Sequence, residues 1–134
     1  MIYPAAYKAE LAKASRLAKR GNTQDAIQTL RGLVADFPKK PAAYLVIGDV
    51  FWQADKWLQA SKAFRVATKQ FPKLEIASLG LFHTLWAQSK TDEAFDEIKR
   101  FQSISYCRDY AEIVDEILRK AKAVRWKTSM SRQP

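Results

Sequence analysis

The segment from Pro41 to Pro72 constrains the fold of this chain more than any other stretch. Within it, large apolar side chains and small ones recur at intervals of three and four residues. Residues spaced in this way lie on one face of an α-helix. The large members are Tyr44, Ile47, Phe51, Trp57 and Phe64, and the small members are Gly48, Ala60 and Ala67. The pattern predicts two closely packed helices, over residues 41–54 and 57–70.

The pattern repeats with a period of 34 residues, since the dipeptide Phe37-Pro38 recurs as Phe71-Pro72. Positions 34 residues before and after those of the central segment keep an apolar or small residue. They are Ala14, Ala26, Leu30 and Leu33 on one side, and Phe82, Ala94, Ile98 and Phe101 on the other. A fixed period of this length indicates a stack of repeated units, in which each unit contacts its neighbours.

These residues at these gaps resemble the tetratricopeptide repeat (TPR), a helix–turn–helix unit of about 34 residues. The resemblance covers the full signature of one repeat, residues 41–74, and implies degenerate repeats at 7–40 and 75–107. It implies an all-α solenoid of antiparallel helix pairs, with about three repeats and a C-terminal capping helix at 108–126. We therefore expect a single domain over residues 1–126 and a basic, flexible tail over 127–134.

Composition favours a helical core of this kind. The chain has 134 residues, is 48% hydrophobic, and holds only four glycines and five prolines, several of them near predicted helix ends. A chain of this length and apolar content can bury a core and is too apolar for disorder. The predicted helices cover residues 5–20, 23–36, 41–54, 57–70, 75–88, 91–103 and 108–126.

Three aromatic residues refine the expectation for the helix pairs. Trp57 occupies an aromatic position of the repeat signature and is expected in the core. Phe82 stands where the repeat has a small residue, so the third helix pair should be splayed or shifted. Tyr106 stands where the third repeat should have its proline.

The resemblance also implies a binding surface, because the first helix of each TPR pair lines a concave groove. The implied groove residues are Leu11, Leu45, Asp49, Trp52, Gln53, Leu79, His83, Trp86 and Ile113. Trp52 and Trp86 lie one repeat apart and should stack along this groove. They could instead serve as core packing between helices, or be covered by the closing helix. His83 and Asp49 would set the register of a bound segment by hydrogen bonding.

The positive charge of the chain lies at its two ends. Residues 1–20 carry five Lys/Arg and one acid, and residues 119–134 carry six Lys/Arg and no acid, whereas the middle is close to neutral. The C-terminal basic end comprises Lys120, Lys122, Arg125 and Lys127. It suits either solvated capping faces, which repeat proteins need for solubility, or attraction to an anionic partner.

The sequence offers little for catalysis. It has one histidine, His83, and one cysteine, Cys107, which removes most zinc sites and leaves no internal disulfide. It has no glycine-rich phosphate loop. We therefore expect no catalytic residue, no metal and no cofactor, and Cys107 is interpreted as a free thiol in the loop before the last helix.

The resulting hypothesis is a cytoplasmic adaptor that binds a helical or extended apolar segment of a partner protein in its groove. One alternative is a chaperone of the type III secretion kind, which holds an export subunit. Another is an accessory factor that binds nucleic acid or an anionic membrane through its basic ends. Self-association of two copies through the groove and the closing helix also remains open.

Overall fold

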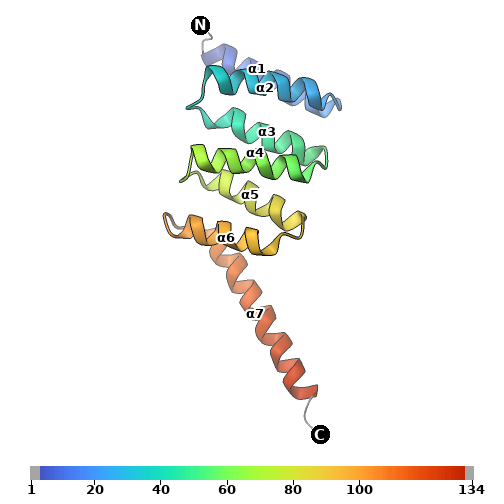
Figure 1. The fold of residues 1–134 in the computed structure, drawn as a ribbon, viewed down its shortest axis with the longest axis vertical. Helices are drawn as coiled ribbons and strands as arrows, with labels where there is room; N and C mark the ends of the chain where they lie inside the picture. The colour runs from blue at the N-terminus through green and yellow to red at the C-terminus, as the bar shows by residue number, and fades with distance from the viewer. Residues whose placement is uncertain (1–3, 132–134) are drawn as a thin grey trace.

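A computed structural model describes the backbone of residues 4–131 and the side chains of residues 5–120, 122 and 123. Within this range the chain forms helices and no strand, which confirms the predicted all-α solenoid. Figure 1 shows α1 to α6 stacked as successive antiparallel pairs, with α7 running away from the stack. The helices are α1 (Pro4–Lys19), α2 (Thr23–Asp36), α3 (Pro41–Gln53), α4 (Trp57–Gln70), α5 (Glu75–Ala87), α6 (Thr91–Gln102) and α7 (Arg108–Ser131).

The bounds of the first six helices agree with the prediction to within one residue. The predicted end of the last helix at Trp126 is wrong, because α7 continues to Ser131. No glycine or proline lies between these two residues, so the sequence supplies no local signal to end the helix there. Residues 132–134 of the predicted tail lie outside the described part of the chain.

The turn inside each helix pair repeats the 34-residue period in the backbone. Gly21, Asp55 and Ser89 occupy equivalent positions, and their φ angles are 84°, 58° and 60°. In each turn, the amide of the following residue donates to the carbonyl five residues earlier, at 2.9 to 3.0 Å. This left-handed closure satisfies carbonyls at the end of the first helix and reverses the chain into the second. Glycine adopts it without strain, whereas Asp55 and Ser89 do not.

The centre of the core is the ring of Phe64 on α4, which is 4% exposed. It lies between two glycines on different helices, Gly48 on α3 and Gly80 on α5. A Cβ atom added at either glycine would lie 2.5 Å from the ring. The two glycines therefore let α3 and α5 approach the same aromatic side chain, one from its own repeat and one from the next.

The third helix pair has a large residue on its first helix where the second pair has a small one, and a smaller residue on its second helix where the second pair has a large one. In the second pair, Gly48 on α3 faces Phe64 on α4. At the equivalent positions, the third pair has Phe82 on α5 and Ile98 on α6, which belong to one buried cluster. That the third pair is splayed or shifted stays a prediction.

The stack is curved toward its first helices. Each of them contacts the next, α1 with α3 and α3 with α5. Among the described helices, no comparable contact joins α2 to α4 or α4 to α6. We call the surface of α1, α3 and α5 the first-helix face and that of α2, α4 and α6 the second-helix face. The first-helix face is the concave one.

Among the described side chains of α7, those of its first turns anchor it to the stack. Tyr110 is fully buried against α5 and α6, and Ile113 and Val114 pack on the same cluster. Beyond them α7 leaves the stack (Figure 1) instead of lying along the concave face. The first-helix face is therefore open. Between residues 4 and 131, no helix is both long enough and apolar enough to cross a membrane.

Candidate functional site

The structure places the predicted groove residues in two layers on the first-helix face. Four of them are half-buried and form its floor, with Leu11 on the N-terminal cluster and the other three on the Phe64 cluster: Leu11, Leu45, Leu79 and Ile113. The remaining five are exposed: Asp49, Trp52, Gln53, His83 and Trp86. The face thus has an apolar floor with two accessible indole rings, of which Trp52 is 36% and Trp86 46% exposed.

The two tryptophans do not stack on each other among the described ring contacts. Trp52 packs edge-on against Trp57, with ring centroids 4.5 Å apart. Trp86 stacks on Phe82 and meets Phe95 edge-on, with centroids 5.9 and 6.0 Å apart. The expected stacking is wrong, because each indole packs on rings of its own helix pair. Trp57, expected in the core, is only half-buried, because it is the first residue of α4, next to the turn that joins α3 to α4.

Part of the predicted site converges on a crevice between α5 and α7, with a volume of about 240 Å³. Its lining is Phe82, His83, Trp86, Ile113, Glu116, Ile117 and Lys120. Lys120, predicted as part of the basic end, thus joins the groove residues, and its ammonium lies 3.2 Å from the Glu116 carboxylate. Lys122 is exposed, and the side chains of Arg125 and Lys127 lie outside the described part of the chain.

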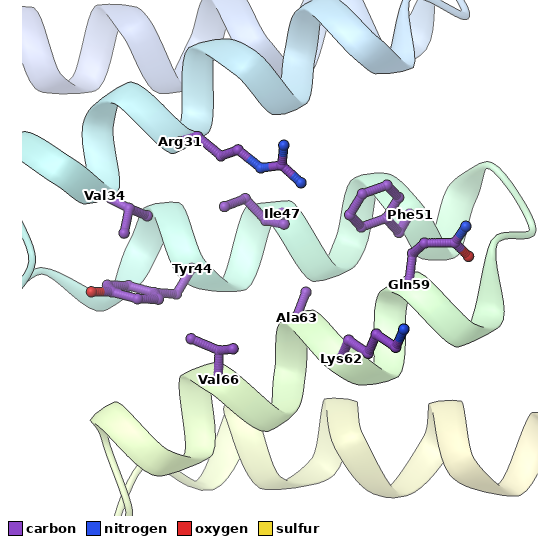
Figure 2. A pocket seen from close by; sticks show the side chains of 9 residues that line it. All are labelled: Arg31, Val34, Tyr44, Ile47, Phe51, Gln59, Lys62, Ala63 and Val66. Atoms are coloured by element: carbon purple, nitrogen blue, oxygen red, sulfur yellow. The ribbon is translucent and has the colours of Figure 1, made fainter.

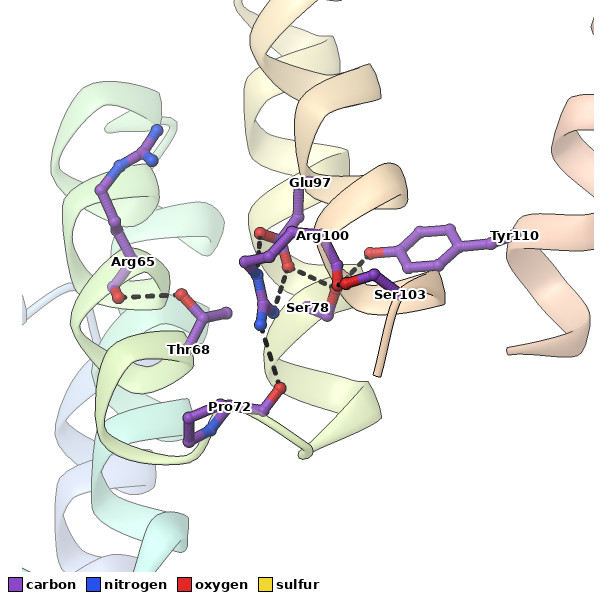
Figure 3. A network of polar contacts seen from close by, with 8 residues as sticks. All are labelled: Arg65, Thr68, Pro72, Ser78, Glu97, Arg100, Ser103 and Tyr110. Atoms are coloured by element: carbon purple, nitrogen blue, oxygen red, sulfur yellow. Dashed lines mark hydrogen bonds and ion pairs between the residues drawn. The ribbon is translucent and has the colours of Figure 1, made fainter. Parts of the chain in front are cut away.

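A buried chain of hydrogen bonds fixes where α7 begins (Figure 3). Ser78 on α5 donates to Glu97 on α6 at 2.5 Å, so the contact of 2.6 Å between Ser78 and Tyr110 requires the phenol to be the donor. Arg100 donates twice to Glu97, at 2.6 and 2.7 Å, and once to the Pro72 carbonyl at 3.1 Å. These contacts connect α5, α6, α7 and the loop before α5.

Four described side chains have a pKa shifted by their surroundings, and that of Arg100 is raised by its hydrogen bonds to Glu97. Burial raises the pKa of the Tyr110 phenol, so the phenol stays protonated as the donor to Ser78. Burial also raises the pKa of Cys107, whose thiol is fully buried and donates to Glu75 at 3.4 Å. Asp49 on the first-helix face keeps part of its surface in solvent, yet partial burial of its carboxyl raises its pKa.

The second-helix face carries an apolar cavity that the sequence did not predict (Figure 2). It has a volume of about 330 Å³ and lies between α2 and α4, over α3. Val66 at its edge is 54% exposed, and Arg31 and Lys62 stand at its rim. The only available signal was the apolar residue at position 66, on a side of α4 that is otherwise polar. The full lining is Arg31, Val34, Tyr44, Ile47, Phe51, Gln59, Lys62, Ala63 and Val66.

No family model and no curated protein sequence matches the chain. Among solved structures, the TPR domain of Sgt2 from Aspergillus fumigatus superposes with a TM-score of 0.67 at 13% identity, covering 92% of this chain and 83% of that one. The fold is a TPR solenoid.

Two further structures share this TPR arrangement. The type III secretion translocator chaperone SycD of Yersinia enterocolitica superposes with a TM-score of 0.65 at 14% identity, covering 95% of this chain and 97% of that one. A chain of the CopN–Scc3 complex superposes with a TM-score of 0.67 at 16% identity, covering 87% of this chain and 69% of that one. At these identities the likeness shows the TPR fold and leaves the bound partner open.

The described side chains offer no metal site. No group of three or more His, Cys, Asp or Glu side chains gathers among them closely enough to hold a metal ion. His83 lies in the α5–α7 crevice, whereas Cys107 is buried in the core. What the first-helix face of this TPR solenoid offers is apolar contact area with polar groups at its edges.

Proposed function

We propose that this TPR protein is a binding module that holds a helical or extended apolar segment of a partner protein on its first-helix face. The observation that carries the proposal is the open concave face, on which Trp52 and Trp86 stay accessible because α7 runs away from it. Indole rings bury large areas at little cost in rotamer freedom and are enriched at binding hot spots.

The expected contacts follow from the two layers of this face. Apolar residues of the partner pack on Leu45 and Leu79 and against the two indoles, which lie seven residues farther along the same helices. Asp49 and His83 offer hydrogen bonds at the edges and favour a partner that presents donors there. No step of this binding requires a cofactor or a chemical reaction, so we propose no enzymatic role.

A second candidate is a chaperone that holds an export subunit in the same groove. It is favoured by the superposition on SycD, which spans nearly the whole length of both chains. The two candidates use the same face and differ in the identity of the segment held there. A cytoplasmic location belongs to both proposals and agrees with the buried free thiol of Cys107.

Affinity capture from a lysate of the source cells tests the proposal, with the purified chain as bait at about 0.1 and 0.5 M salt. The higher salt screens surface charges almost completely. We expect one stoichiometric protein at both salt concentrations, and its identity would distinguish an adaptor from an export chaperone. Retention of nucleic acid or many acidic proteins at low salt alone would contradict the groove and favour the basic ends.

Matched variants assign the binding to a face. The double variant Trp52→Ala/Trp86→Ala should weaken a groove partner by about 2 kcal/mol or more, which is roughly thirtyfold in Kd. Val66→Ala is the control, because it removes an exposed apolar residue from the second-helix face. The thermal stability of each variant separates lost binding from lost folding.

A further inference from the structure

The backbone of α7 continues beyond the stack of the other helices (Figure 1). Tyr110, Ile113 and Val114 anchor the first half to the stack. Farther along, Leu118 is 55% exposed, and Figure 1 shows the rest of α7 standing clear of every other helix. Residues 119–131 correspond to about 20 Å of helix at 1.5 Å per residue. An isolated helical segment of this length is marginal in water, so it calls for a partner.

An open apolar cavity lies beside the point where α7 leaves the stack. Its volume is about 510 Å³, and it lies between α6 and α7. Apolar side chains from both helices form its walls, and the two carboxylates of Asp92 and Asp96 stand among its lining. We call it the α6–α7 cavity, lined by Asp92, Phe95, Asp96, Ile98, Lys99, Gln102, Val114, Ile117 and Leu118.

The charge of α7 reverses sign at its middle. Residues 108–118 hold one arginine and four carboxylates, a net charge of −3. Residues 119–131 hold five Lys/Arg and no acid, a net charge of +5. The apolar positions 114, 117, 121 and 124 follow one another at intervals of three and four, the spacing of helices that pair along a seam. The acidic half adjoins the α6–α7 cavity, and the backbone of the basic half stands clear of the stack (Figure 1).

We propose that two copies of this chain associate through an antiparallel pair of α7 helices. In this arrangement the basic half of each α7 lies over the α6–α7 cavity of the other copy. Opposite charges then face each other along the whole pair, and the two helix dipoles also oppose. A two-fold axis relates the copies, so each contributes the same two surfaces and the assembly closes as a dimer.

Charge selects this arrangement over the alternatives. A parallel pair would place acidic halves side by side and basic halves side by side, which is unfavourable. A second copy's basic half laid in the α5–α7 crevice would meet one carboxylate, Glu116, which already pairs with Lys120. The α6–α7 cavity instead presents Asp92 and Asp96. The dimer leaves the first-helix face open, so it goes beyond the proposed groove function and can fail independently of it.

Sedimentation of the full chain over about 1 to 100 μM, with two charge-reversal variants, tests the dimer. Lys122→Glu/Arg125→Glu lowers the net charge of residues 119–131 from +5 to +1 and puts carboxylates at two of the positions that face the cavity of the other copy, and Asp92→Lys/Asp96→Lys makes the cavity rim basic. Among the described ion pairs, none involves Lys122, Asp92 or Asp96. Each variant alone should raise the dimer Kd by about tenfold or more. Mixing the two should restore association as a heterodimer, because the opposed surfaces become complementary again.

Rescue on mixing separates this interface from general damage, and thermal melts of each variant report whether it is folded. A wild-type chain that stays monomeric at 100 μM would overturn the proposal. Binding of that monomer to phosphatidylserine vesicles would then assign the basic half of α7 to an anionic membrane instead. A dimer whose Kd is unchanged in both variants would also overturn it, because the copies would then meet elsewhere.

Discussion

Gly80 on α5 lies directly against the ring of Phe64 on α4, at a distance that leaves no room for a side chain. A Cβ atom added at Gly80 would lie 2.5 Å from Cε1 of Phe64, and the ring is buried between α3 and α5. We predict that Gly80→Ala lowers the free energy of unfolding by about 1 to 2 kcal/mol. Overpacking outweighs the helix propensity that alanine gains over glycine.

Gly32→Ala is the matched control for this prediction. Gly32 also lies inside a helix, but nothing stands within 4 Å of an added Cβ atom. Alanine there should raise the free energy of unfolding by about 0.5 to 1 kcal/mol through propensity alone. Urea unfolding of the two variants measures both changes in the free energy of unfolding, which should have opposite signs. Equal changes at the two positions would refute the close contact at Gly80.

The left-handed turn at Ser89 predicts a stabilising substitution. Ser89 has a φ of 60°, where its equivalent in the first repeat is Gly21. Ser89→Gly should raise the free energy of unfolding by about 1 kcal/mol, because glycine reaches this backbone conformation without steric cost. Gly21→Ala should have the opposite effect. A thermal melt of each variant measures the change, and destabilisation by Ser89→Gly would show that this turn is not strained.

The hydrogen-bond chain from Tyr110 through Ser78 to Glu97 predicts an order of effects. Tyr110→Phe removes the donor itself and should lower the free energy of unfolding by about 1 kcal/mol. Ser78→Ala should cost more, about 2 kcal/mol or more, because the buried phenol and the carboxylate both lose a partner. Chemical denaturation of both variants tests this order. Equal or reversed costs would mean that Ser78 does not link the two groups.

Asp49 predicts a pH-dependent substitution. Its folded-state pKa is raised above the ordinary 3.8 by burial, so its charged form is less stable in the folded state than in the unfolded state. The contribution of Asp49 to the free energy of unfolding is therefore greatest at pH values below 3.8, where the carboxyl is protonated in both states. It falls as the pH rises through the folded-state pKa. Asp49→Asn should be the more stable protein at pH 7, and its advantage should vanish toward pH 3. Melting temperatures of the wild type and of Asp49→Asn across a pH series measure this difference. An Asp49→Asn variant that is less stable than the wild type at pH 7 would mean that the Asp49 carboxylate has a stabilising partner.

The repeat signature carried enough information to predict the stack but not its turns. Spacings of three and four residues marked the helices, and the period of 34 marked the pairs. Gly21 is a residue type that favours a left-handed turn, so that turn could be predicted. Asp55 and Ser89 adopt the same positive φ although their side chains disfavour it, so tertiary packing imposes the conformation at these two positions. The sequence indicated that the large Phe82 stands where the repeat has a small residue. It did not indicate that Ile98, at the position of Phe64, is the smaller residue facing it.

The parts of the site that depend on distant contacts could not be predicted. The direction of α7 rests on Tyr110 reaching Ser78, 32 residues earlier, and on Ser78 reaching Glu97. The partners of Trp52 and Trp86 depend on how far each helix pair opens. The cavity beside Val66 exists because α2 and α4 stand apart, which no spacing within one helix reveals.

Site-specific photo-crosslinking in the source cells tests the central claim most directly. A photoreactive phenylalanine analogue replaces Trp86 on the first-helix face or Val66 on the second-helix face, both of which are about half exposed. Binding in the groove predicts a discrete crosslinked protein from position 86, weakened by Trp52→Ala, and none of it from position 66. The same product from position 66 alone would contradict the account, because the partner would then bind the opposite face.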